Sequence, residues 1–426
     1  MKVTYITHAC VLLELDNLKI LTDPWLVGPC WGGNLWHYPI HKYSPKNLPR
    51  PDIIYFSHGH DDHYHVDTIE QFPKSWFKAL VVVPRFKEKW WTEALNSRFE
   101  NIKYFKHNEI FNVNKYLKLQ IFFNDLGHID SSLKIIHKNK SCFLQTDNLM
   151  SIKEAERIGK LGKIDFAFVM PFLTGSYPGF YKMKKKVLLE QGKIKNNKSL
   201  NLCLNILRKL KPKNVIPYAC DTSYLGENFK VNYIHTHDKR HLIQFLKKNK
   251  FKSNFLIMNP GDYFKSLNNK LFKKITKYEY NKKSLDKFLV TKTKDFNQYI
   301  KKEKEFANIN STNLISKFKE KVKKELKKIK NFNFKISFII KEKNKESQNL
   351  ILDLKTKKIN FDKLDNNSKY DLKIFIDSYK IKNLMKKKYP MNFATFSNGG
   401  FLCERKKLSL TPKELKFWVW MHDISF

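Results

Sequence analysis

The residues best suited to chemistry stand together in the segment DIIYFSHGHDDHYHVD, residues 52–67. Within it, His58, His60, Asp62 and His63 follow the spacing His-x-His-x-Asp-His. Neutral imidazoles and carboxylates are ligands for Zn, Fe and Mn, and alternate residues on an extended loop can converge on one ion while the next pair faces a second. A solvated polar turn is the alternative, but four ligand-type residues at this spacing after an apolar strand form a specific motif. The segment therefore predicts a site for one or two metal ions.

The flanking sequence places these residues on a loop between a strand and a helix. Residues 53–56 are β-branched or aromatic and predict a buried strand, while a helical pattern restarts over residues 66–72. His65 and Asp61 lie in the same loop but are expected to be ordinary surface residues.

Two further candidate ligands follow later strands. His128 comes after the strand predicted at residues 117–123, and Asp147 ends the apolar strand CFLQTD. An unpaired carboxylate in such a place is costly to bury, so Asp147 is expected to meet a cation. The prediction is that His58, His60 and His128 hold one side of the metal site and that Asp62, His63 and Asp147 hold the other.

Strands and helices alternate along the first 265 residues, which predicts an α/β layered domain. Residues 266–310 are polar and poorly patterned, as expected of a linker region. Residues 311–426 begin with helical spacing and continue with strand-like runs at 334–340, 350–354 and 372–376, which indicates a small α+β domain.

Composition limits the partners of this 426-residue chain. The net charge is +41, but only seven of the 81 basic residues are arginine, so the surplus does not resemble a nucleic-acid surface and nucleic acid is an unlikely partner. The positive field favours an anionic small-molecule substrate. The six cysteines form no C-x-x-C pair, and neither a signal peptide nor an 18-residue apolar run is found, so we expect a cytoplasmic protein with no membrane span.

The order of the predicted ligands resembles the metallo-β-lactamase superfamily, which implies an αββα sandwich of two sheets with helices outside and a one- or two-metal site at the sheet edge. Whole phrases, VTYITHACVLLEL, TDPWLVGP, DIIYFSHGHDDH, GSYPG at 175–179 and VIPYAC, are similar to the body of the CMP-N-acetylneuraminate hydroxylases over about residues 1–265. The small C-terminal domain is similar to sterol-carrier-type folds.

The hydroxylase resemblance implies an iron-dependent monooxygenase that acts on an anionic, nucleotide-sugar-type substrate. The superfamily alone implies the alternative, a zinc-dependent hydrolase of a phosphodiester, lactone or amide in which Asp62 also orients the nucleophile. A non-catalytic binding protein is the third possibility. In the enzymes, His8 is expected beside the metals as a catalytic residue, and the loops with Trp25, Ser176 and Tyr177 are expected to bind substrate at the rim.

Two departures from these families stand out. The hydroxylases carry an N-terminal Rieske iron-sulfur domain, whereas this chain begins at the first predicted strand, so no built-in Rieske cluster is expected and a separate ferredoxin or reductase would supply electrons. The hydrolases usually place a last histidine ligand after a late strand. Asp221 stands there in this chain. His235, His237 or His241 nearby could substitute, or these histidines are ordinary surface residues and none is a ligand, so the last ligand stays open.

Overall fold

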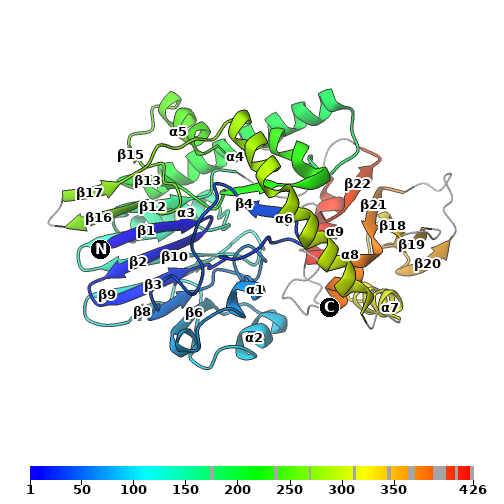
Figure 1. Ribbon diagram of the computed structural model, residues 1–426, viewed down its shortest axis with the longest axis horizontal. Helices are drawn as coiled ribbons and strands as arrows, with labels where there is room; N and C mark the ends of the chain where they lie inside the picture. Colours follow the sequence, from blue (N-terminus) through cyan, green and yellow to red (C-terminus); the bar gives the residue numbers. More distant parts are fainter. Residues whose placement is uncertain are drawn as a thin grey trace.

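A computed structural model describes residues 1–172, 177–234, 238–267, 270–309, 313–342, 347–362, 370–386, 400–407 and 411–422. Two large sheets make up the body of the molecule, and a third sheet lies to one side of them (Figure 1). Ser176, His235 and His237 fall outside the described residues.

The first large sheet has eight strands. The five strands from one edge, β17 to β3, pair antiparallel, and β3, β5, β6 and β7 then run parallel to one another. In spatial order the strands are β17 (Lys270–Lys274), β16 (Tyr263–Leu267), β1 (Lys2–Thr7), β2 (Cys10–Leu15), β3 (Leu18–Thr22), β5 (Ile53–Tyr55), β6 (Leu80–Pro84) and β7 (Ile102–Phe105).

The second large sheet has seven strands and packs face to face with the first. Its order is β15 (Asn254–Phe255), β13 (Asn214–Pro217), β12 (Phe166–Val169), β11 (Lys140–Leu144), β10 (Ser131–His137), β9 (Leu117–Phe123) and β8 (Ile110–Asn112). Alternate residues of both sheets, such as Val3, Leu13, Leu119 and Ile135, meet in one buried core. Period-two alternation places these side chains on the inner faces, which is why the two sheets stack.

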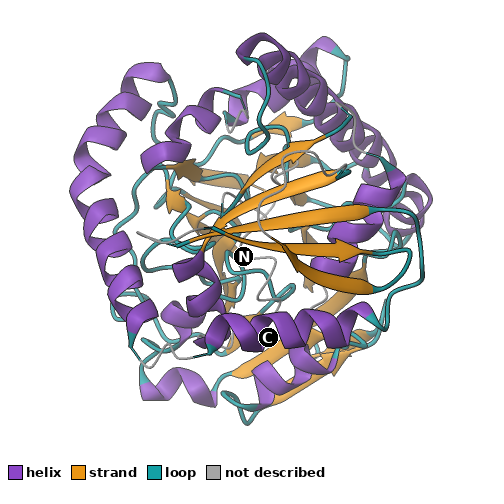
Figure 2. Ribbon diagram, turned by 90° about the vertical axis from the view of Figure 1, so that its right-hand side faces the viewer, coloured by secondary structure: helices purple, strands orange, loops and turns teal. Residues whose placement is uncertain are grey.

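Helices cover both outer faces, as Figure 2 shows by the purple ribbons around the orange strands. Trp76 and Leu95 pack on the outside of the first sheet, and Ile158 and Leu207 pack on the outside of the second. The helices of the first sheet are α1 (Val66–Ile69), η1 (Lys74–Lys78) and α2 (Lys89–Asn96), and those of the second are α3 (Ile152–Lys160), α4 (Lys185–Leu210) and α5 (Lys239–Lys248). This is the αββα sandwich of the metallo-β-lactamase fold, as predicted.

A small two-stranded antiparallel sheet joins two segments that are far apart in the chain. It joins β4 (Leu35–His37) to β14 (Thr222–Tyr224), and η2 (Gly226–Tyr233) follows it. A membrane-crossing helix is not found among the described residues, where none combines the required length and apolar character.

The C-terminal sheet has five strands and its own buried core, which includes Phe338, Ile374 and Phe417. Its order is β20 (Lys358–Asp362), β19 (Gln348–Asp353), β18 (Lys335–Lys341), β21 (Leu372–Asp377) and β22 (Leu402–Arg405), and its helices are α7 (Leu314–Leu326), α8 (Ser378–Lys386) and α9 (Pro412–His422).

The stretch predicted to be a linker contains regular structure. It includes β17 and the 27-residue helix α6 (Lys282–Asn308), which passes between the body and the C-terminal sheet in Figure 1. The apolar face of α6 is narrow, because Leu285 and Phe288 are buried while most of its other side chains are exposed, and the pattern is therefore faint in the sequence. The domain limits at 265 and 310 stay a prediction.

Candidate metal centre

The candidate site begins where β5 ends. All three residues of β5 are buried, and the strand runs parallel to β3 on one side and β6 on the other. The loop that follows enters α1, where His65 is the N-cap and its side chain accepts a hydrogen bond from the Thr68 backbone N–H. His65 is only 2 % exposed, so the prediction of a surface residue is wrong: the ring closes the loop onto the helix.

The first group of donors consists of His58, His60 and Asp130, whose ligand atoms all lie within 4.8 Å of one another. His58 Nε2 is 2.7 Å from His60 Nδ1 and 3.5 Å from Asp130 Oδ1. His128, predicted for this group, is exposed, and its backbone N–H donates to Asn124 Oδ1. The structure thus places Asp130 where His128 was predicted, because Asp130 directly precedes β10 and points inward, whereas His128 lies in the turn before it.

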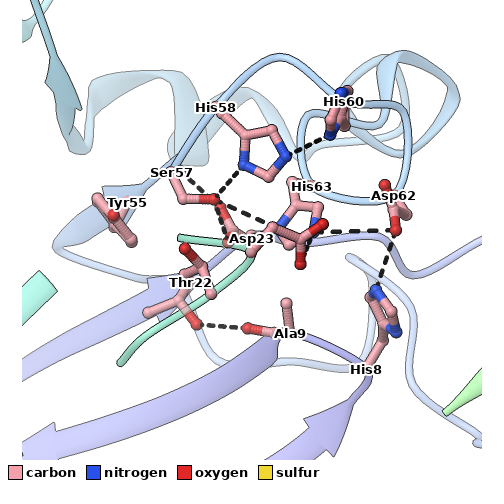
Figure 3. A network of polar contacts seen from close by, with 12 residues as sticks. His8, Ala9, Thr22, Asp23, Tyr55, Ser57, His58, His60, Asp62 and His63 are labelled. Atoms are coloured by element: carbon pink, nitrogen blue, oxygen red, sulfur yellow. Dashed lines mark hydrogen bonds and ion pairs between the residues drawn. The ribbon is translucent and has the colours of Figure 1, made fainter. Parts of the chain in front are cut away.

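The second group is centred on His63. Its Nε2 atom is 3.3 Å from Asp147 Oδ1 and 3.8 Å from Asp62 Oδ2. Asp62 Oδ2 also lies 3.1 Å from His8 Nε2, as Figure 3 shows. The predicted set of Asp62, His63 and Asp147 is therefore brought together, and His8 lies beside it as expected.

Several donor atoms of this second group are buried without a hydrogen-bond partner in the described part of the chain. They are His8 Nδ1, Asp62 Oδ1, His63 Nε2 and Asp147 Oδ1. Buried polar atoms are normally hydrogen-bonded, since leaving them unpaired costs about 1–3 kcal/mol each. His63 Nε2 and Asp147 Oδ1 face each other at 3.3 Å and fit a metal cation that would bind both, whereas His8 Nδ1 lies on the side of its ring away from Asp62.

Asp23 supports the donors from behind. Its Oδ1 accepts the Ser57 backbone N–H at 2.7 Å, and its Oδ2 accepts the Ser57 hydroxyl at 2.7 Å and lies 2.8 Å from His63 Nδ1 (Figure 3). Ser57 Oγ also lies 2.9 Å from His58 Nδ1. These contacts orient the imidazoles of both groups so that the opposite nitrogen faces the centre. Asp23 belongs to the phrase TDPWLVGP but is not among the site residues predicted from the sequence.

The donor residues differ in how their surroundings shift their pKa values. Burial, with His63 nearby, holds the pKa of His58 well below its usual range, so this ring is neutral. Burial also lowers the pKa of His63, but Asp147, Asp62 and Asp23 outweigh it and raise that pKa well above 6.5. Burial and the neighbouring Asp147 raise the pKa of Asp130. A cation would therefore displace protons on binding.

Asp61 and Trp31 fix a loop over the site. Asp61 Oδ2 accepts the Trp31 backbone N–H at 2.6 Å, and the Trp31 ring centre is 5.2 Å from that of His60. Burial raises the pKa of Asp61 to about 6. Asp61 thus has a structural partner, contrary to the prediction of an ordinary surface residue.

The described residues that were predicted to bind substrate, Trp25 and Tyr177, are packed against other parts of the protein. Trp25 is fully buried between His8 and His37, and its Nε1–H donates to the Gly28 carbonyl at 3.1 Å. The Tyr177 hydroxyl donates to Gln191 Oε1, and its ring lies 4.2 Å from the Arg405 guanidinium of the C-terminal sheet. Trp25 thus packs against His8, and Tyr177 packs against Arg405 of the C-terminal sheet, so contact of either residue with a substrate stays a prediction.

Asp221, one of the possible last ligands, is engaged in a buried ion pair. Its Oδ1 lies 2.8 Å from Lys239 Nζ, its Oδ2 accepts the Tyr5 hydroxyl, and Lys239 and Asp221 are at most 1 % exposed. Asp221 is not among the candidate metal donors found within the described residues.

Comparison with known proteins agrees with the fold and with the motif phrases. Residues 2–141 match the family described as Beta-lactamase superfamily domain. The cytidine monophosphate-N-acetylneuraminic acid hydroxylase of Xenopus laevis is 26 % identical over 273 residues, which are 61 % of this chain and 43 % of that protein. The protein of the same name from Asterias rubens is 41 % identical over 71 residues, 16 % of this chain and 11 % of the relative. The chain thus spans less than half the length of these relatives.

Among solved structures, CmlA, a diiron beta-hydroxylase from Streptomyces venezuelae, aligns with a TM-score of 0.43 at 15 % identity, covering 64 % of this chain and 54 % of that one. Residues 2–141 thus match a beta-lactamase superfamily domain, and the body of the chain is similar in sequence to the cytidine monophosphate-N-acetylneuraminic acid hydroxylases.

Proposed function

We propose that this protein is an iron-dependent hydroxylase that acts on an anionic, nucleotide-sugar-type substrate and receives electrons from a separate protein. The observation that carries the proposal is the number of carboxylates among the donors, because Asp130, rather than a third histidine, lies beside His58 and His60, and Asp62 and Asp147 lie close by. Two histidines and one carboxylate occur both in non-haem iron oxygenases and in some zinc hydrolases, so the additional carboxylates and the hydroxylase relatives are what favour iron.

The wider donor set supports iron in the same way. Three carboxylates, Asp62, Asp130 and Asp147, share the centre with the imidazoles. Catalytic zinc sites more often use three histidines, or two histidines with one carboxylate, around a single ion. The sequence relatives named hydroxylases support the same reaction class.

The residues of the chain would bind the metal, orient its ligands and exclude water. Bound iron would supply the activation of O₂, with one oxygen atom entering a C–H bond and the other leaving as water after the uptake of two electrons and two protons. His8 holds Asp62 through Nε2, which restricts that carboxylate to one orientation. Trp31 lies against His60 and is 3 % exposed, so it excludes water from that side of the centre.

The substrate class rests on charge and on the relatives. The net charge of +41 attracts an anion toward the protein, and CMP-N-acetylneuraminate, which the relatives' name implies, carries both phosphate and carboxylate. The electron donor would be a ferredoxin or reductase, because the six cysteines of the chain are all buried as free thiols.

The test compares protein reconstituted with Fe(II) and with Zn(II). We expect uptake of O₂ only with Fe(II), CMP-N-acetylneuraminate and a reducing system, with one atom of labelled O₂ recovered in the product by mass spectrometry. Turnover of a phosphodiester, lactone or amide by the Zn(II) form without O₂ would instead establish the hydrolase. A protein that folds fully and retains turnover without metal would contradict both enzymes.

A further inference from the structure

A pocket of about 520 Å³ lies between α6 and the C-terminal sheet, remote in sequence from the metal donors. Figure 1 shows α6 crossing beside α8 at this place. The pocket is lined by the end of α6, the end of β18, and the junction of β21 with α8. The lining residues are Lys304, Asn308, Lys341, Glu342, Asp377, Ser378, Tyr379 and Lys382. The volume is that of a small-molecule site.

Three lysines from three elements face this pocket. Lys304 belongs to α6, Lys341 ends β18, and Lys382 lies in α8. Within the described residues, no ion pair joins any of the three to a carboxylate, although Asp377 is the register partner of Lys341 in the sheet. Lys304 Nζ instead lies 5.5 Å from the centre of the Tyr379 ring. Three ammonium groups without carboxylate partners around one concavity favour an anion.

Neutral hydrogen-bond donors add to the preference of the pocket for an anion. α8 begins at Ser378, which lines the pocket, so the positive end of the dipole of this helix lies at the pocket. Burial, with Asp377 nearby, raises the pKa of Tyr379, which keeps its hydroxyl protonated as a donor. These groups can bind the oxygens of a phosphate that the lysines attract.

The two acids of the pocket narrow the ligand class. Carboxylates such as Asp377 and Glu342 accept hydrogen bonds from hydroxyl groups, as in a polyol, while they repel a second phosphate. A divalent cation is disfavoured by the three lysines, and a nucleic-acid backbone is disfavoured by the acids and by the concave shape. A ligand with one anionic end and several hydroxyls satisfies both kinds of side chain.

We propose that this pocket is a binding site for a small phosphorylated sugar, with its phosphate on Lys304, Lys341 and Lys382 and its hydroxyls on Asp377 and Glu342. The site is separate from the metal centre and does not depend on the proposed hydroxylase activity. One helix serves both regions, because the Tyr299 ring of α6 packs directly against Gly33 in the loop that carries Trp31.

The test uses the full chain after removal of metal with a chelator, titrated calorimetrically with glucose 1-phosphate, inorganic phosphate and methyl glucoside. The variant Lys304→Ala/Lys382→Ala removes two pocket lysines. The control Lys301→Ala/Lys324→Ala removes the same charge from exposed positions outside the lining, and circular dichroism checks that both fold. We expect glucose 1-phosphate to bind about tenfold or more weakly to the pocket variant and unchanged to the control.

Several results would overturn the proposal. Equal weakening in both variants would indicate nonspecific attraction to a basic protein, and binding of methyl glucoside with the same affinity would remove the role of the phosphate. Loss of binding in a His63→Ala variant would place the ligand at the metal centre. Absence of binding by every probe would reject the site, whatever the outcome of the iron experiments.

Discussion

Replacing Asp23 by Asn tests whether the carboxylate behind the donors controls metal binding. Asp23 has a φ of +37°, and Asn tolerates this left-handed backbone better than most residues, so the change isolates the side chain. If the Asn Oδ1 keeps the bond from the Ser57 N–H, its NH₂ group replaces Oδ2 and faces His63 Nδ1. That nitrogen must then accept, and its proton moves to Nε2, the atom that faces Asp147.

The expected loss follows from this change of tautomer. With Asp23 present, Nδ1–H donates to the carboxylate and leaves the Nε2 lone pair available for a metal. Loss of such a supporting carboxylate lowers metal affinity about 10- to 100-fold, or about 1.4–2.7 kcal/mol. Competition with a fluorescent chelator measures the affinity, and elemental analysis gives the stoichiometry.

Asp52→Asn is the matched control. Asp52 Oδ2 accepts a backbone N–H, from Lys19 at 2.9 Å, but this carboxylate does not contact a donor residue. We expect Asp52→Asn to bind metal as the wild type does. Wild-type affinity in Asp23→Asn, or an equal loss in the two variants, would refute the assignment of Asp23 as an orienting group.

Three further changes probe neighbouring residues. His8→Ala should lower turnover with metal content unchanged, because His8 positions Asp62; loss of metal by elemental analysis would make His8 a ligand. Lys239→Met should cost about 3–5 kcal/mol in urea unfolding, because it leaves Asp221 buried and unpaired, while metal content stays the same. His41→Gln should reduce the loss of stability in acid. Burial lowers the pKa of His41 from 6.5 to about 4, so its contribution is present above pH 6.5 and is lost as pH falls toward 4.

The predictions for Lys239 and His41 can each be contradicted by a specific result. Loss of metal in Lys239→Met without loss of stability would return Asp221 to the list of ligands. The pH effect of His41 has an upper limit of about 3 kcal/mol, read from unfolding free energies between pH 7 and pH 4. Identical pH profiles of His41→Gln and wild type would show that this ring is not buried in solution.

The sequence by itself determined the parts of the site that lie close together along the chain. His58, His60, Asp62 and His63 share one loop, and the strand before them and the helix after them dictate that loop, so their spacing was enough. Asp147 could also be predicted from the sequence, because a carboxylate at the end of an apolar strand is costly to bury unless it binds a cation. Alternation of strand and helix likewise indicated the layered body.

The tertiary structure alone decided which distant residues complete the site. His128 and Asp130 are two residues apart at the start of β10, and the turn between β9 and β10 determines which of them points inward. Asp221 stands where a ligand was possible, but it pairs with Lys239, a residue from another element. Such choices depend on strand register and on contacts between segments far apart in the chain, and local residue spacing does not encode either of them.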